Sequence, residues 1–366
     1  MVNGVTAFSP NYVTARQRFR NAATARGWSL DSQAVENVGP DDCELFWDAA
    51  YSPVTGTDKA IIISSGLHGV EGFFGSAVQL AFLESQRRLA DTGIRYLFLH
   101  GLNPYGFAWL RRFTEDNVDL NRNFLLPGEP YAGAPEGYAA LDGLLNPKCP
   151  PSRWEPFRLK ALLAVAGQGM NSLRQTIAAG QYEFPQGLFF GGLAPSATSR
   201  WLAAHLPRWL EGVKDVLHLD IHTGLGRWGD SKLLIDYELT AFQRQRLSDW
   251  FGSDSFEIGA ESEVAYPTRG SFGKWCVSQG WAANYLYACA EVGTYDPIHV
   301  LGALRAENQA HHWSTDASTV ARWAKQRLKE SFCPSSPGWR AQTVEDALQL
   351  LHRGERGLAA LPSGTN

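Results

Sequence analysis

Two side chains that could bind a metal ion stand three residues apart, directly after an apolar run. His68 and Glu71 follow Ile61 to Leu67 and precede apolar residues that recur at helical spacing to about Leu89. A buried strand over residues 60–64 followed by a helix would bring both to the carboxyl edge of a sheet, where α/β folds bind ligands. An imidazole and a carboxylate are two of the three ligands of a His2Glu zinc site. A single H-x-x-E also occurs in salt bridges and helix caps, so this motif alone leaves both interpretations open.

Further titratable residues stand at the ends of other predicted strands. His218, Asp220 and His222 alternate with apolar residues in the strand predicted over 213–221, so they share one face. Glu291 directly follows the apolar strand predicted over 282–290. Polar side chains gathered at several strand ends are typical of a catalytic site built on a sheet edge.

The elements that would position these residues alternate between strands and helices. A strand at 60–64, a helix at 71–89 and a strand at 94–99 predict a right-handed β-α-β crossover with parallel pairing. We therefore predict an α/β fold with a mixed, mostly parallel twisted sheet flanked by helices. Further expectations are a hairpin within 28–48, a strand at 233–237, and helices at 10–27, 157–180, 196–211, 241–251, 271–280, 299–331 and 340–353.

The Pro- and Gly-rich stretch 125–156 predicts a long irregular insertion, either a functional lid or decoration. Length allows one large α/β domain or two smaller ones, and we predict a single catalytic domain over 1–366 with its core at about 58–297. C-terminal helices would follow over 299–353.

Composition excludes several classes of protein. A net charge of -4 without a Lys/Arg run argues against a nucleic-acid surface. No apolar run reaches the roughly 20 residues that span a bilayer, and the N-terminus shows no signal peptide. Five widely spaced cysteines without a C-x-x-C pair fit reduced thiols. We therefore predict a cytoplasmic protein, and the sequence does not predict its oligomeric state.

Five segments, in the same order, resemble the zinc carboxypeptidase superfamily (metallopeptidase M14), which is related to the aspartoacylase-like deacylases. The nearest resemblance is to the bacterial branch with a DUF2817-type domain. The match covers roughly residues 58–297. Its segments are His68 to Glu71 (H-x-x-E), Asn103-Pro104-Tyr105-Gly106 (similar to N-P-D-G), Val118 to Phe124, Asp220-Ile221-His222, and Tyr266 before Gly270-Ser271 with Glu291 to Thr294.

The resemblance implies a role for each matching residue. His68, Glu71 and His222 would hold Zn2+ together with a water molecule, whose pKa the metal lowers toward about 7. Glu291 would be the general base toward that water and return the proton to the leaving amine.

Three further residues have implied roles with open alternatives. Arg122 would stabilise the oxyanion, or else form a structural ion pair with Asp119 or Asp116. Tyr266 would cap the substrate or donate a hydrogen bond, or be an ordinary loop tyrosine. Asp220 would orient an imidazole or make a structural hydrogen bond. His218 and His100 are interpreted as structural.

The sequence also departs from the superfamily. Its peptide-cleaving members carry an Asn-Arg pair, shortly after the arginine segment, that grips the terminal carboxylate of the substrate. No such pair occurs between Leu125 and Asp142, and Tyr105 replaces the usual Asp of N-P-D-G. Possible substitutes for the pair are Arg153, Arg158, Arg200 and Arg269.

The predicted function is zinc-dependent hydrolysis of an amide or peptide bond, in the manner of a metallocarboxypeptidase. The substrate would be a peptide or an N-acyl amino acid. An N-acyl amino-acid deacylase or other small-amide hydrolase is the alternative. A non-catalytic binding protein that keeps the fold is a third reading, disfavoured because all the candidate residues are present.

Overall fold

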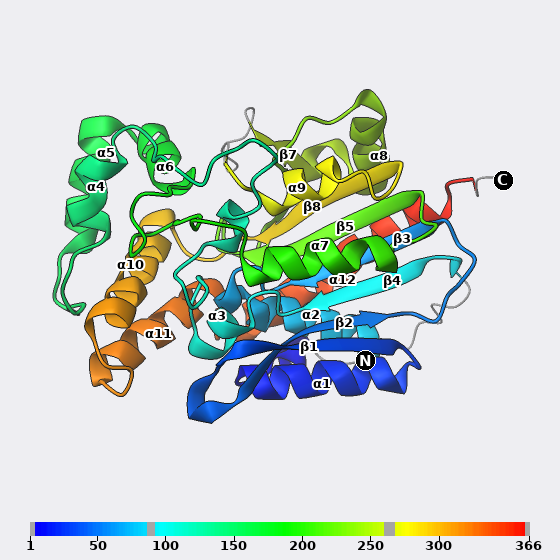
Figure 1. The fold of residues 1–366 in the computed structure, drawn as a ribbon, viewed down its shortest axis with the longest axis horizontal. Helices are drawn as coiled ribbons and strands as arrows, with labels where there is room; N and C mark the ends of the chain where they lie inside the picture. The colour runs from blue at the N-terminus through cyan, green and yellow to red at the C-terminus, as the bar shows by residue number, and fades with distance from the viewer. Residues whose placement is uncertain (1–3, 86–91, 260–267, 363–366) are drawn as a thin grey trace.

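The computed structural model describes residues 4–85, 92–259 and 268–362. In these residues one sheet of eight strands has the order β1-β2-β4-β3-β5-β8-β6-β7 (Figure 1). Its strands are β1 Ser29–Val38, β2 Glu44–Tyr51, β3 Lys59–Ser65, β4 Arg95–His100, β5 Asp215–Thr223, β6 Ser231–Ile235, β7 Phe256–Ile258 and β8 Asn284–Val292. The four central strands β4, β3, β5 and β8 are parallel, as are β6 and β7. The pairs β1–β2, β2–β4 and β6–β8 are antiparallel, which confirms the mixed, mostly parallel sheet.

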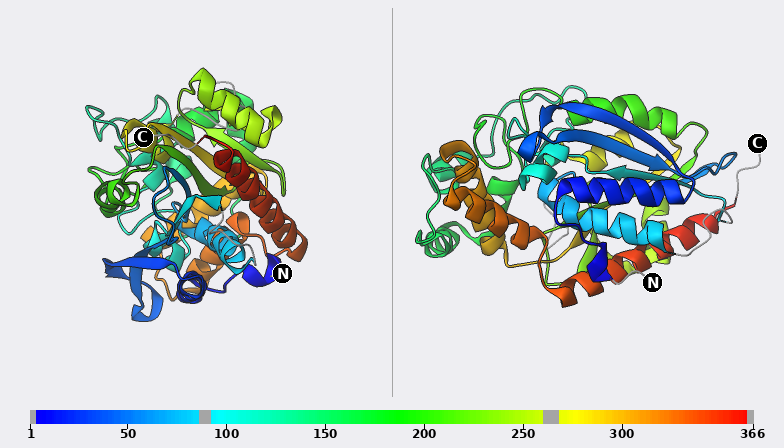
Figure 2. Two further views of the ribbon diagram at one scale, coloured as in Figure 1. Left: turned by 90° about the vertical axis from the view of Figure 1, so that its right-hand side faces the viewer. Right: turned by 90° about the horizontal axis from the view of Figure 1, so that it is seen from below.

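Helices cover both faces of this sheet (Figure 2). They are α1 Tyr12–Ala25, α2 Gly72–Glu84, α3 Pro104–Trp109, α4 Tyr138–Leu145, α5 Phe157–Gln168, α6 Met170–Ala178, α7 Ala197–Trp209, α8 Ala241–Phe251, α9 Phe272–Ser278, α10 Pro297–Trp313, α11 Thr319–Phe332 and α12 Pro337–Ala359. Side chains of α1, α2, α8 and α12 pack on one face with Ile61 and Ile63. Side chains of α7 and α9 pack on the other with Ile62. None of the helices within the described ranges is long and apolar enough to cross a bilayer.

The alternation of side chains along β5 produces the polar row that the sequence predicts. His218, Asp220 and His222 lie in register with Tyr287, Cys289 and Glu291 of the parallel neighbour β8. His218 and Asp220 are fully buried, and His222 nearly so. Both strands lie between two helical layers, so their apolar residues are buried on either face and read as continuous runs in the sequence.

Several predicted boundaries are wrong in detail. Glu291 lies inside β8 rather than after it. The insertion 125–156 is not wholly irregular, because it contains α4. The helix predicted over 157–180 is two helices, interrupted at Gly169, whose φ of 81° is incompatible with an α-helix. The region 299–331 likewise forms α10 and α11. Together α4, α5 and α6 lie beside α10 at one end of the molecule (Figure 1).

Candidate metal centre

The turn between β3 and α2 is held against a neighbouring segment of backbone. The amide of Gly69 donates to the Arg112 carbonyl (3.1 Å), and the amide of Val70 donates to the Arg111 carbonyl (2.7 Å). A Cβ at residue 69 would lie 2.2 Å from the carbonyl carbon of Gly106, so only glycine permits this approach. The turn that carries His68 and Glu71 is thereby fixed.

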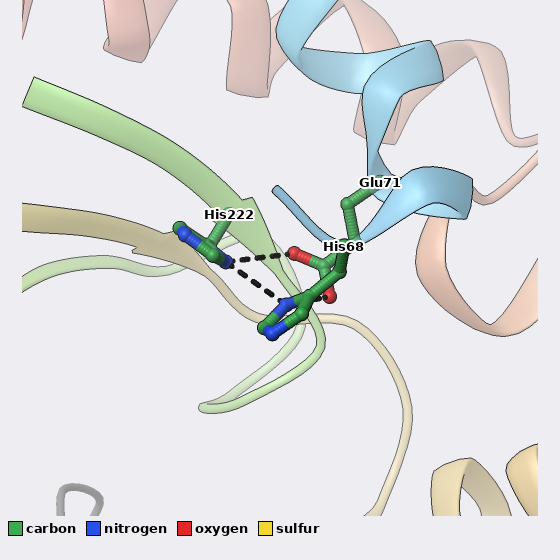
Figure 3. A group of neighbouring side chains, drawn as sticks. All are labelled: His68, Glu71 and His222. Atoms are coloured by element: carbon green, nitrogen blue, oxygen red, sulfur yellow. Dashed lines mark hydrogen bonds and ion pairs between the residues drawn. The ribbon is translucent and has the colours of Figure 1, made fainter. Parts of the chain in front are cut away.

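His68, Glu71 and His222 converge at the carboxyl edge of the central strands (Figure 3). The two Nδ1 atoms lie 3.2 Å apart. Glu71 places Oε1 2.9 Å from Nδ1 of His68 and Oε2 3.1 Å from Nδ1 of His222. All three residues are buried. The structure therefore brings the three predicted ligands together from β5 and the β3–α2 turn.

This donor set fits a zinc ion. Ligand atoms about 2.0–2.2 Å from one tetrahedral ion are separated from each other by roughly 3.3–3.5 Å. The observed separations of 2.9, 3.1 and 3.2 Å are only slightly shorter. Two imidazole nitrogens that face each other at this distance cannot both carry a proton, whereas both lone pairs can bind one cation. His68, Glu71 and His222 would hold the metal, with one position left for water or substrate.

A carboxylate lies behind each imidazole. Asp119 Oδ1 lies 3.2 Å from His68 Nε2, and Asp220 Oδ2 lies 2.6 Å from His222 Nε2. Such partners fix the tautomer and orientation of a metal-binding histidine. Asp220 also accepts hydrogen bonds from the Ser64 hydroxyl (2.6 Å) and from the Tyr287 hydroxyl (2.9 Å).

Neighbouring charges shift the pKa values of Asp119 and His222 in the centre. Burial acts to raise the pKa of Asp119, but the charges of Arg112 and His68 outweigh it and hold this pKa well below the usual range. Burial would lower the pKa of His222, but Asp220 and Glu71 raise it well above its usual value. Without a metal, a proton on His222 thus partly neutralises the negative charge of Asp220 and Glu71.

Arg112, rather than Arg122, is the arginine beside the triad. Its Nη2 lies 2.7 Å from His68 Nε2 and its Nη1 3.3 Å from Glu71 Oε1, while Nε donates to Asp119 Oδ2 (2.9 Å). Arg122 is buried nearby and donates through Nε (2.9 Å) and Nη2 (2.5 Å) to the Ala178 carbonyl. Asp119 therefore forms its ion pair with Arg112.

Glu291 lies opposite His222 across the β5–β8 pair. Its Oε1 accepts a hydrogen bond from the Leu225 amide (2.9 Å). Burial, and then the negative charge of Glu71, raise the pKa of Glu291 to about 7. This value suits a group that must accept and return a proton near neutral pH. Cys289 lies two residues earlier on the same face, with its Sγ 3.8 Å from Glu291 Oε2.

The other candidates of the sequence have clear positions, with one exception. Tyr266 lies outside the described residues. His218 contacts the Ser64 and Tyr285 hydroxyls, and His100 contacts Ser76, in keeping with structural roles. Arg269 donates to the carbonyls of Pro130 (2.7 Å) and Ala132 (3.0 Å), so it fastens part of the insertion.

Arg112 and Asp119 are the residues that the sequence did not single out for the metal centre. The available signal was weak: two adjacent arginines in the apolar context Leu110-Arg111-Arg112-Phe113. A charged residue in such a context is buried only when it is paired, which points to an ion-pair site without saying which partner it has.

The chain belongs to the family described as "Protein of unknown function (DUF2817)", whose profile matches residues 8–346. This confirms the branch that the motifs indicate. Comparison with curated proteins gives no match.

The solved structures to which the chain is similar include the following three, all at low sequence identity. Carboxypeptidase A from Helicoverpa armigera is 14% identical, over 87% of this chain and 73% of that one, with a TM-score of 0.46. Bovine thrombin-activatable fibrinolysis inhibitor is 12% identical, over 87% and 98%, with a TM-score of 0.45. Succinylglutamate desuccinylase from Chromobacterium violaceum is 14% identical, over 90% and 76%, with a TM-score of 0.38.

Proposed function

We propose that the chain is a zinc-dependent amide hydrolase of the metallocarboxypeptidase type. The observation that carries this proposal is the position of Glu291, a buried carboxylate with a pKa near 7, directly across a strand pair from the ligand His222. A proton acceptor beside an open metal position is the arrangement that activates water for attack on a carbonyl.

Each residue of the centre would contribute one part of the reaction. Bound zinc would acidify a water molecule and polarise the substrate carbonyl. Glu291 would take the proton of that water on its carboxylate and return it to the leaving nitrogen. Its Oε1 is held by the Leu225 amide, so the carboxylate is oriented before the substrate binds.

Arg112 would stabilise the developing oxyanion. When His68 binds metal through Nδ1, its Nε2 carries the proton, and Asp119 Oδ1 is the acceptor within reach. Arg112 Nη2 can then no longer donate to Nε2, because two N–H groups cannot face each other at 2.7 Å. We infer that this guanidinium edge turns to the substrate oxygen, where a fixed positive charge has most effect.

The role implied for Arg122 changes once Arg112 is the arginine of the metal centre. We infer that Asn121 and Arg122, which lie inside the segment Val118 to Phe124, would then take the part of the Asn-Arg pair, with Arg112 as the preceding arginine. The guanidinium groups of Arg112 and Arg122 lie 5.5 and 5.8 Å from the centre of the same Phe189 ring, so both arginines contact one aromatic side chain. We propose that Asn121 and Arg122 bind the terminal carboxylate of the substrate.

The test is hydrolysis of N-acylated dipeptides with a free or an amidated C-terminus by the zinc-loaded chain. We expect cleavage of the free peptide, a large loss on amidation, and loss of activity in Glu291→Gln. Cleavage of N-acyl amino acids without any dipeptide cleavage would favour the deacylase alternative. No cleavage of either class by zinc-loaded protein would contradict the proposal.

A further inference from the structure

Phe189 has a backbone conformation that is unusual for its side chain. Its φ is 58°, in the left-handed region, which glycine adopts readily and a bulky residue only at a cost in free energy. Hydrogen bonds on either side hold this conformation. The Leu188 carbonyl accepts one from the Tyr138 hydroxyl (2.7 Å), and the Phe190 carbonyl accepts one from the Asp119 amide (2.7 Å). A strained residue that its surroundings hold in place is typical of a functional site.

The ring of Phe189 contacts two charged groups of the proposed site. It is buried, in the same apolar cluster as Val70 of the turn that carries two of the ligands. The guanidinium groups of Arg112 and Arg122 lie over the ring, 5.5 and 5.8 Å from its centre, within the roughly 6 Å at which an aromatic face attracts a cation. Burial acts to raise the pKa of Asp119, whereas the charges of both arginines act to lower it, so both act on this carboxylate of the metal centre.

The ring supplies an interaction that the hydrogen bonds of the two arginines do not. Those bonds act at the edges of the groups: Arg112 donates through Nε to Asp119, and Arg122 donates through Nε and Nη2 to the Ala178 carbonyl. The aromatic face attracts the positive charge as a whole, without selecting one N–H group. Arg112 can therefore turn its Nη2 from an imidazole to a substrate oxygen and keep its contact with the ring.

We infer that Phe189 is a positioning residue of the hydrolase, whose ring holds the guanidinium groups of Arg112 and Arg122 in place together. This inference rests on the proposed function, in which Arg112 stabilises the oxyanion and Arg122 binds the terminal carboxylate. Glycine would relieve the backbone strain at this position, so the strain is offset by what the ring does. One ring would thus fix two charges that act on the same substrate.

Fluorinated phenylalanines at residue 189 test this role with little change of shape, because fluorine withdraws electron density from the ring face. With the zinc-loaded chain and an N-acylated dipeptide that has a free C-terminus, one to three fluorines should lower kcat/KM stepwise, by about 3- to 30-fold in total. We expect kcat to fall and KM to rise, because the ring contacts the arginine assigned to each. The matched control is the same series at Phe113, which is buried in the same cluster beside Arg111 and should leave both constants unchanged.

Equal rates along the series at residue 189, or the same fall at residue 113, would overturn the inference and leave the hydrolase standing. Absence of cleavage by the unmodified chain would instead remove the hydrolase, and NMR of the arginine side chains then decides the inference. The Nε–H groups of Arg112 and Arg122 should exchange with solvent about 10-fold faster in Phe189→Leu than in the wild type, and Phe113→Leu should not have this effect. Unchanged exchange in Phe189→Leu, or equal acceleration in both variants, would overturn the positioning role.

Discussion

At the scale of single residues, the proposed role of Glu291 as general base makes activity depend on its protonation state. Its raised pKa means that activity should increase with pH as the carboxylate forms, with the midpoint at or below about 7. Bound zinc can only lower that midpoint, since a nearby dication favours the carboxylate. A pH profile of kcat/KM for the zinc-loaded chain measures this limb. Activity that falls across pH 5–7 as pH rises would contradict the role of Glu291 as base.

Glu291 should destabilise the metal-free protein at neutral and higher pH. Because the folded pKa of about 7 exceeds the ordinary value of 4.5, folding favours the protonated acid, and stability falls as pH rises from 4.5 through 7. We expect Glu291→Gln to raise the free energy of unfolding at pH 8 by about 1–3 kcal/mol, and to have little effect at pH 4.5. Urea unfolding at both pH values checks this. An equal effect at both would show that the carboxylate charge is not the cause.

Substitution of Arg112 and of Arg122 should change different kinetic constants. Arg112→Ala should lower kcat about 100- to 1000-fold, because it removes an interaction strengthened in the transition state. Arg122→Ala should mainly raise KM for substrates with a free C-terminus. Steady-state kinetics on one peptide and its amide distinguish the two. A loss confined to KM in Arg112→Ala would return the oxyanion role to Arg122.

At the scale of elements, β5 carries both the proposed ligand His222 and Asp220, the carboxylate that would orient it. Asp220→Asn should weaken zinc binding about 10- to 100-fold, because His222 loses the carboxylate on its Nε2. Asp215→Asn is the matched control, since it removes an acid on the same strand that pairs with Arg246 instead. Competition for zinc against a chromophoric chelator measures the difference. Equal affinities of the two variants would show that Asp220 has no orienting role.

Elements also explain what the sequence could and could not predict. The strands β3 and β5 are apolar runs with interspersed polar residues, so the strands and the shared face of His218, Asp220 and His222 follow from the periodicity, whereas the metal-binding roles of His68, Glu71 and His222 follow from the resemblance. The position of Arg112 beside the triad does not follow from the sequence pattern. After α3, Leu110 adopts the left-handed conformation (φ 56°, ψ 50°), and this turn directs the chain so that Arg111 pairs with Glu307 and Arg112 with the triad. A left-handed leucine has no signature in the sequence.

At the scale of the whole molecule, zinc should link the halves of the chain. Its ligands come from the turn after β3 and from the end of β5, about 150 residues later, so the unfolded chain cannot offer them together. Free zinc at 100 times its Kd should add about 2.7 kcal/mol to the free energy of unfolding. Thermal unfolding with zinc and with EDTA measures this. An unchanged Tm would mean that the folded protein does not bind zinc preferentially.

The central claim is that His68, Glu71 and His222 form a zinc site, and the zinc content of the purified protein tests it most directly. The measurement is made on the wild type beside His222→Ala, after zinc reconstitution and removal of excess metal. We predict about one zinc per chain in the wild type and a loss of most of it in the variant. No zinc in the wild type, or as much in His222→Ala, would contradict the assignment of the site and with it the proposed hydrolase.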